Sequence, residues 1–183
     1  MDHFDSKADV EKYIRSLGIP ASFFMPGWYM QNLKNGYLHP NPASAEHEFV
    51  FQSPNPPQTP IPLFDAAEDT GKFVKAILLN RETTLGKRIY AATDYYTCEQ
   101  IVREFSEAKP EAGRGAKYEE VPPEAYKKFL MEVAGLKEVG AAELTENQQF
   151  LTEFGYYGGA GLSESHKVYS FSSTFSHHIM HCV

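Results

Sequence analysis

Lys7 is the first residue of this sequence whose type and position could do chemistry. A helix predicted to begin at Ser6 carries Lys7 in its first turn, where the helix dipole disfavours a cation. One interpretation is a lysine that faces solvent. The other is an ammonium group that a helix flanking a sheet points at the ribose of a bound cofactor.

A second group of chemically capable residues lies near the end of the chain, where His177, His178, His181 and Cys182 have the types of metal ligands. Their spacing would place the three histidines near one face of a helix. The host segment, residues 169–183, has no charged residue and no clear period, and no complementary cluster lies nearby. We therefore expect an atypical, disordered tail at residues 168–183 and no functional metal site.

The third group is glycine-rich and aromatic. Residues 155–161 are rich in glycine but follow a predicted helix, whereas a phosphate-binding loop follows a strand, so a helix terminus and turn is the better interpretation. The sequence contains no Gly-x-Gly-x-x-Gly motif, P-loop or nucleophile elbow. Aromatic side chains could line an apolar pocket, although a place in the core and at a lobe interface is favoured. They are Phe24, Trp28, Tyr29, Tyr95, Tyr96, Tyr156 and Tyr157.

Composition describes an ordinary globular protein of one domain, with at most a small extra lobe. The 183 residues are 42% hydrophobic and 22% charged, with a net charge of −7. This acidic balance argues against direct binding to nucleic acid or to an anionic membrane, and no apolar stretch is long enough to span a bilayer. Only two cysteines occur, far apart, so a reducing compartment fits best, and we expect the cytoplasm, the nucleus or both.

The elements that must position these residues alternate between helix and strand. A helix is predicted from Ser6 to a stop at Gly18. Its apolar residues follow helical spacing: Val10, Tyr13, Ile14 and Leu17. Residues 21–25 form a short apolar run that predicts a buried strand, followed by a helical turn or loop at residues 28–33. A helix, a short turn and a buried strand form half of a βαβ unit.

The rest of the chain continues this alternation. Seven of the twelve prolines fall within residues 39–62, which predicts loop with one edge strand at residues 48–52 and excludes a central strand. Asp65 is predicted to cap a helix that runs to Asn80, and Thr97 another, with Gln100 as its capping-box partner. Further strands are expected at residues 87–92 and 117–121, and further helices at residues 123–131 and 143–157.

Taken together, several of these segments resemble the NmrA-like family, atypical relatives of the short-chain dehydrogenases. The resemblance covers roughly residues 2–167 and is carried by residues 3–13, 18–32, 62–71 and 86–92. It implies an α/β fold with a Rossmann domain that binds NADP or NAD. It also implies that Lys7 contacts the nicotinamide ribose and that Tyr29, Met30, Gln31 and Asn32 line the nicotinamide end of the cleft. Catalytic residues are not identified.

This sequence departs from the family pattern because the glycine-rich phosphate loop and the first strands are absent. We therefore expect a truncated Rossmann-like fold that lacks the N-terminal glycine-rich βαβ half, with a small α+β C-terminal lobe. The NmrA-like domain would occupy residues 1–167, with the cleft remnant at residues 1–38 and 61–93 and the lobe at residues 94–167. Cofactor binding is expected to be weak, because the phosphate loop holds most of the dinucleotide.

The favoured function is a redox-sensing or transcription-regulatory protein whose cofactor binding is weak or lost, and a non-catalytic role is favoured over that of an oxidoreductase. One alternative is an NAD(P)H-dependent reductase or isomerase of a small metabolite. Another is a non-enzymatic interaction module. The strand at residues 21–25 would present an unpaired apolar edge, which predicts self-association or a protein partner.

Overall fold

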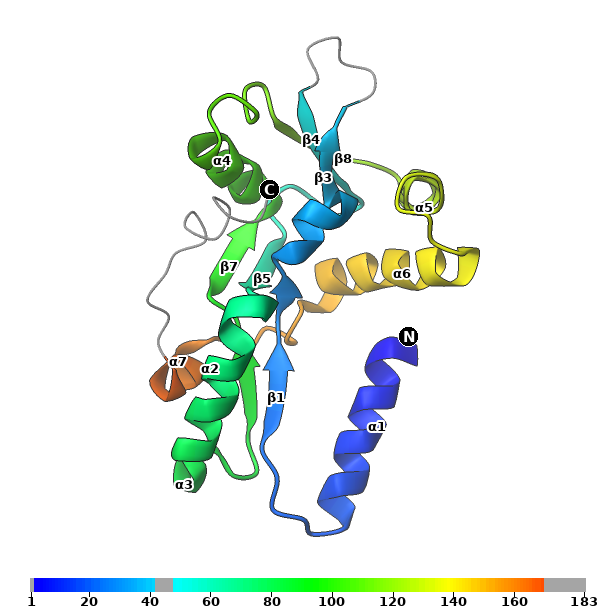
Figure 1. Ribbon diagram of the computed structural model, residues 1–183. Coiled ribbons are helices and arrows are strands. Elements are labelled where there is room, and N and C mark those ends of the chain that lie inside the picture. The colour runs from blue at the N-terminus through cyan, green and yellow to red at the C-terminus, as the bar shows by residue number, and fades with distance from the viewer. Residues whose placement is uncertain (1, 42–47, 170–183) are drawn as a thin grey trace.

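The parallel pairing of β1 (Phe23–Pro26) with β6 (Arg88–Ala91) is the part of the fold on which the candidate site depends (Figure 1). The computed structural model describes residues 2–41 and 48–169. Within these ranges the strands form three small sheets, in the orders β1-β6, β2-β5-β7 and β3-β4-β8. The prediction of an α/β fold is confirmed, whereas the division into a cleft remnant and a lobe remains a prediction.

The other strands and the helices have the following bounds. The strands are β2 (Trp28–Tyr29), β3 (Leu38–Pro40), β4 (Phe49–Ser53), β5 (Pro60–Phe64), β7 (Asp94–Thr97) and β8 (Lys117–Glu120). The helices are α1 (Asp2–Ser16), the π-helix η1 (Leu33–Tyr37), α2 (Ala66–Leu79), α3 (Arg81–Thr84), α4 (Cys98–Ala108), α5 (Pro123–Glu132), α6 (Glu138–Phe154) and α7 (Ser163–Val168). No helix in these described ranges is long and apolar enough to cross a membrane.

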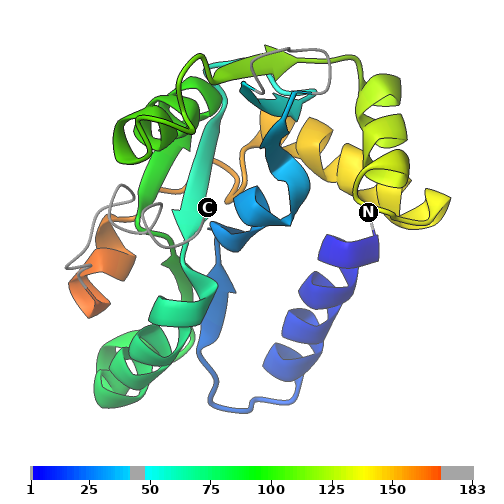
Figure 2. The ribbon, with the colours of Figure 1, turned by 45° about the horizontal axis from the view of Figure 1, so that its top comes forward.

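The two faces of the β1–β6 sheet are covered differently, because side chains alternate along a strand. Ile89 and Ala91 pack with Phe73 of α2 in one apolar cluster. On the other face the guanidinium of Arg15 lies 4.4 Å from the centre of the Phe23 ring. In both views α1 lies on one side of β1 and α2 on the other (Figures 1 and 2). One face of the sheet thus packs on apolar side chains of α2, and the other meets the charged side of α1.

The opening helix begins earlier than predicted. α1 starts at Asp2, so Ser6 lies within the helix and does not cap it, and Lys7 falls in the second turn. The expected conflict between Lys7 and the helix dipole therefore disappears, since that effect is confined to the first turn. The predicted stop is confirmed, because the helix ends at Ser16 and Gly18 has a φ of +66°.

The strand predicted at residues 21–25 lies two residues further along, at Phe23–Pro26, and all four of its residues are half-buried. Within the described residues β1 pairs with β6 alone, so its second edge has no strand beside it. The expectation of a deeply buried strand was wrong. The second edge of β1 has no partner strand among the described residues, as predicted.

The exclusion of a central strand from the proline-rich segment was also wrong, because β5 lies between β2 and β7. Leu63 O accepts from Thr93 N on the β7 side, and Phe64 O accepts from Met30 N on the β2 side. Pro60 and Pro62 share the alternation of Phe64, so their nitrogens face the β2 side. There β2 pairs only with Leu63 and Phe64. The missing N–H groups are therefore not needed for pairing. The strand predicted at residues 48–52 is likewise not an edge strand, because β4 lies between β3 and β8.

Helix caps were predicted more accurately than helix lengths. The Asp65 carboxylate accepts from the backbone N–H groups of Ala67 and Glu68, and Thr97 and Gln100 form a complete capping box. By contrast α6 runs from Glu138 to Phe154, not through residues 143–157, and ends at Gly155. The predicted turn or loop at residues 28–33 contains β2, and β3, β7 and α7 were not predicted. The tail predicted to be disordered falls almost wholly outside the described residues.

Candidate functional site

The carboxyl ends of β1 and β6 lie together, because the strands run parallel and in register from Phe23 opposite Arg88 to Pro26 opposite Ala91. In open α/β sheets this edge is where ligands bind. Gly27 follows β1 directly, and its N–H donates to Ala91 O at 2.9 Å. The residues predicted to line a cofactor cleft come next along the chain.

The hydroxyl of Tyr157 links β1 and β6 at their carboxyl ends. Its hydroxyl lies 3.0 Å from Met25 O and 3.4 Å from Ala91 O, so it bonds to both strands. Burial raises the pKa of Tyr157 far above its ordinary value, which keeps the hydroxyl protonated and donating. Tyr157 therefore braces the carboxyl ends of β1 and β6 through these two hydrogen bonds.

The backbone packs closely at the same point. A Cβ added to Gly27 would lie 2.4 Å from Pro62 O and 3.1 Å from the Tyr157 hydroxyl. Real side chains do not tolerate such a distance to a carbonyl oxygen, so only glycine lets β1 pass this close to β5. Gly27 thus sets how the following segment leaves the sheet.

The predicted segment Tyr29, Met30, Gln31 and Asn32 leaves β2 and enters a turn before η1. Tyr29 is 43% exposed, and Asn32 is partly exposed. Met30 is 1% exposed and its side chain belongs to the main core. Of the four, Tyr29 has the most exposed side chain, and the buried Met30 attaches the turn to the main core.

Gln31 links this turn to α2. Its Nε2 donates to the Asp65 carboxylate at 2.7 Å, and its Oε1 accepts from Ala66 N at 3.2 Å. The same carboxylate caps α2 and is 2% exposed. Both ends of the Gln31 amide are therefore used within the fold, so Gln31 positions its neighbours Tyr29 and Asn32.

Lys7 is exposed and lies in the first half of α1. This half of the helix is level with the carboxyl end of β1 (Figure 1). Phe4, one turn earlier, stacks on Phe150 of α6 with ring centres 5.6 Å apart, and its ring lies edge-on to Tyr156. These contacts hold the amino end of α1 at the edge of the sheet where Tyr29 lies, while the role of Lys7 toward a ligand remains a prediction.

The described residues fit the nicotinamide end of a dinucleotide better than its phosphates. An exposed aromatic ring at the carboxyl edge and a lysine on the flanking helix suit a flat ring and a ribose. The glycine-rich segment does not form a phosphate cradle, because it follows α6, and Gly155, Gly158 and Gly159 adopt positive φ angles in a turn. This agrees with the interpretation of that segment as a helix terminus.

The aromatic residues proposed to line a pocket mostly fill the core. Trp28 is a buried member of the main cluster, Tyr96 and Tyr156 pack against it, and Phe24 packs against the cluster on α2. Burial also raises the pKa of the Cys98 thiol to about 12, so this cysteine is no nucleophile at neutral pH. Neither group offers reactive chemistry.

No group of three side chains that could hold a metal ion occurs in residues 2–41 and 48–169. His177, His178, His181 and Cys182 lie outside the described residues. The sequence patterns do not single out a buried carboxylate, Glu11, which is 7% exposed and bonded to both Arg15 and Arg88. The four-residue spacing of Glu11 and Arg15 was the available signal for the first of these pairs.

Comparison with known proteins finds relatives of the NmrA type both by sequence and by structure. The nitrogen metabolite repression protein nmr of Neurospora crassa is 30% identical over 123 residues, which make up 65% of this chain and 25% of that protein. The crystal structure of NmrA, a negative transcriptional regulator, in complex with NADP superimposes with a TM-score of 0.63 at 23% identity, and covers 94% of this chain and 55% of that one.

Enzymes share the same fold. An NADPH-dependent quinone oxidoreductase from Escherichia coli superimposes with a TM-score of 0.71 at 21% identity, covering 97% of this chain and 60% of that one. The chain thus spans about a quarter of the Neurospora protein and a little over half of these solved structures. A profile of the NmrA-like family matches residues 1–179, and the chain therefore belongs to the NmrA-like family.

Proposed function

We propose that this chain is a regulatory protein that holds the nicotinamide end of NAD or NADP weakly and senses its redox state without turning it over. The observation that carries the proposal is the arrangement at the carboxyl edge of β1. There Gln31, two residues after the exposed Tyr29, is bonded to Asp65, and the carboxyl end of β1 is level with the half of α1 that carries Lys7. The proposed setting is the cytoplasm or the nucleus.

Each of these residues has a separate task. The Lys7 ammonium donates to a ribose hydroxyl, Tyr29 offers its ring to the nicotinamide, and Asn32 lines the turn beside it. Met30 and Gln31 keep the turn in place. When bound, the cofactor supplies a ring that exists in an oxidised, charged form and a reduced, neutral form. Tyr157 has its hydroxyl bonded to two carbonyl groups, which favours a binding role over proton transfer.

The relatives support a regulatory role. NmrA is a negative transcriptional regulator and has been solved with NADP and with NAD, and the Neurospora relative is a nitrogen metabolite repression protein. Affinity should be low, because the 183 residues contain no glycine-rich phosphate loop of the Gly-x-Gly-x-x-Gly type.

Lys7→Ala should weaken binding of reduced nicotinamide mononucleotide by about tenfold, the usual loss for one hydrogen bond from a charged donor. This probe is chosen because it contains the nicotinamide ribose and lacks the adenosine half. The measurement is a calorimetric titration. Lys12→Ala is the matched control, since Lys12 is exposed on the same helix and pairs with Asp9 at 2.9 Å. Equal affinity in the Lys7 and Lys12 variants would remove Lys7 from the site.

The same samples test the enzymatic alternative. A triphenylmethane reductase from Citrobacter sp. and the Escherichia coli quinone oxidoreductase share the fold. We expect no oxidation of NADPH above background when a quinone is added. Steady turnover would favour the reductase, and tight NADPH binding by this chain alone would contradict the weak affinity proposed above.

A second candidate function is self-association, favoured by the surface beside β1. β1 has a free edge within the described residues, and an apolar stripe on α1 and the residue after it is exposed: Val10 by 58%, Tyr13 by 65% and Leu17 by 53%. We propose that a second copy of this chain covers this surface through a twofold axis. Such an axis pairs the β1 edges of the two copies antiparallel, and it packs the apolar stripe of one copy against the same stripe of the other.

Tyr13→Glu should shift this association toward monomer, because it puts a charge in the centre of the stripe. The measurement is molar mass by light scattering across micromolar concentrations. Leu78→Glu is the control, since Leu78 is 72% exposed on α2, away from the surface. A wild-type chain that stays strictly monomeric would refute the proposal, and so would an equal shift in both variants.

A further inference from the structure

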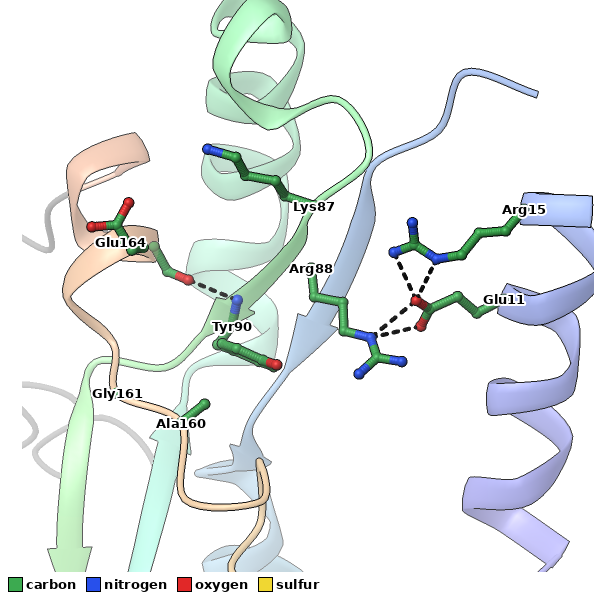
Figure 3. Close-up of a pocket in the computed structure, with 9 residues that line it drawn as sticks. Glu11, Arg15, Lys87, Arg88, Tyr90, Ala160, Gly161 and Glu164 are labelled. Atoms are coloured by element: carbon green, nitrogen blue, oxygen red, sulfur yellow. Dashed lines mark hydrogen bonds and ion pairs between the residues drawn. The ribbon is translucent and has the colours of Figure 1, made fainter. Parts of the chain in front are cut away.

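A cavity of about 680 Å³ opens on the face of β6 that α1 covers, outside the site described above. Glu11 and Arg15 of α1 lie on one side of it, Ala160 and Gly161 on the other, and Arg88 and Tyr90 between them (Figure 3). Arg88 is the first residue of β6 and Arg15 lies in the last turn of α1. The cavity is therefore nearer the amino-terminal end of the sheet, whereas Tyr29 follows the carboxyl end.

The charges around this cavity are not balanced. Arg15, Lys87 and Arg88 contribute three cations, against the two carboxylates of Glu11 and Glu164. Glu11 pairs with both arginines, and Glu164 pairs with Lys167 and also interacts with the charge of Lys87. The excess is positive in a protein whose net charge is −7, so this local charge is not an effect of overall composition.

Glu11 bonds both arginines, but only Arg88 keeps donors for a ligand, because Arg15 bonds Glu11 through Nε and Nη2 and Gly86 O through Nη1. Arg88 bonds the two carboxylate oxygens through Nε alone, at 2.9 and 3.0 Å. Its two terminal nitrogens remain, and Tyr90 is the side chain within bonding reach of them. Burial raises the pKa of Glu11, but the hydrogen bonds from Arg88 and Arg15 outweigh this and lower it. The carboxylate thus stays ionised and keeps the guanidinium of Arg88 fixed.

Ser165 adds a neutral donor to the wall. It is 2% exposed, and its oxygen accepts from Tyr90 N at 2.7 Å. A hydroxyl that accepts in this way still has its own proton to donate. Lys87 extends from the start of β6 toward α7 (Figure 3) and forms no ion pair with any residue of the described part of the chain. In Figure 3 Lys87 and Arg88 extend in different directions from β6, so an anion bonded to Arg88 would be reached by the long Lys87 side chain only after it changes rotamer.

We propose that this cavity binds a small organic oxyanion, a carboxylate or a phosphate ester, through Arg88, Lys87 and Ser165. The planar fork of Arg88 suits either group, because both present two oxygens side by side. The volume leaves room for a metabolite as well as for a bare ion. This gives the chain a second ligand site, independent of the nicotinamide proposal.

The test is a calorimetric titration of the full chain with two probes, succinate for the carboxylate source and glycerol phosphate for the phosphate source. Chloride holds the ionic strength constant, because screening alone changes weak binding to charged surfaces. Arg88→Gln and Lys87→Gln should each weaken the better probe by about tenfold or more. Lys128→Gln should leave binding unchanged, since Lys128 is exposed on α5 and pairs with Glu132.

Lys87→Gln protects the test against a folding defect, because Lys87 takes no part in the Glu11 pairs. The backbone amide signal of Tyr90 in a nuclear magnetic resonance titration provides a local readout, since that amide donates to Ser165. Saturable binding that moves this signal and falls in both variants supports the site. Failure of both probes to bind the wild-type chain, or equal binding by all three variants, would overturn it.

Discussion

Gly27→Ala should lower the free energy of unfolding by about 3 kcal/mol, a cost typical of severe overpacking. The added methyl group would meet Pro62 O at 2.4 Å, and neither backbone can move aside easily. Gly27 N is bonded to Ala91 O at 2.9 Å, and Leu63, next to Pro62, pairs with β2 and β7. Thermal unfolding followed by circular dichroism should show a midpoint lower by roughly 6 to 12 °C.

Gly71→Ala is the matched control for this change. Gly71 lies in the middle of α2, is exposed, and has nothing within 4 Å of an added Cβ. The same substitution there should stabilise the protein by about 0.5 to 1 kcal/mol, because alanine favours helix. Opposite signs at the two glycines are expected. A neutral Gly27→Ala would mean that β1 and β5 do not approach as closely as described.

Asp65→Ala should cost about 3 kcal/mol, which exceeds the usual loss of a helix cap. The carboxylate accepts from two backbone N–H groups of α2, and it also receives Nε2 of Gln31 at 2.7 Å. Its removal leaves a part-buried amide without this acceptor and frees the turn that holds Tyr29. Chemical denaturation should therefore show lower stability, and hydrogen exchange should show faster opening of residues 29–32.

Asp65→Asn separates the hydrogen bonds from the charge. An asparagine oxygen can accept the same bonds at an N-cap, so the expected loss is within about 1 kcal/mol. If the asparagine variant is as unstable as the alanine variant, the charge matters more than the cap. If both are as stable as the wild type, the link between α2 and the turn at Gln31 does not support the fold.

Local chemistry explains which parts of the fold could be predicted from the sequence. Caps such as Asp65 and Thr97 depend on residues within one turn, so their side chains identify them without knowledge of the fold. The family resemblance identified the α/β class for a similar reason, since it depends on contiguous stretches. β5 could not be predicted, because the tolerance of its prolines depends on which side of the strand lacks a partner, and that is a tertiary property.

The candidate site shows the same division. Lys7 and residues 29–32 were identified by resemblance, and their roles toward a cofactor await the titrations above. The structure adds that Met30 is in the core and that Gln31 is bonded at both ends of its amide. The basic cavity was not foreseen, because Glu11 and Arg88 are 77 positions apart and no local pattern joins them. Burial of a carboxylate becomes visible only when α1 packs on β6.

The hydroxyl of Tyr157 also has a consequence for the order of events during synthesis. It reaches back across 132 positions to Met25 O and across 66 to Ala91 O. Contacts of such sequence separation form late, because the chain must close a long loop before they stabilise it. On the ribosome, β1 and β6 can pair well before residue 157 emerges. The two strands are then paired, but their carboxyl ends still lack the hydrogen bonds of Tyr157. The ability to bind a ligand at this edge is therefore acquired late in synthesis.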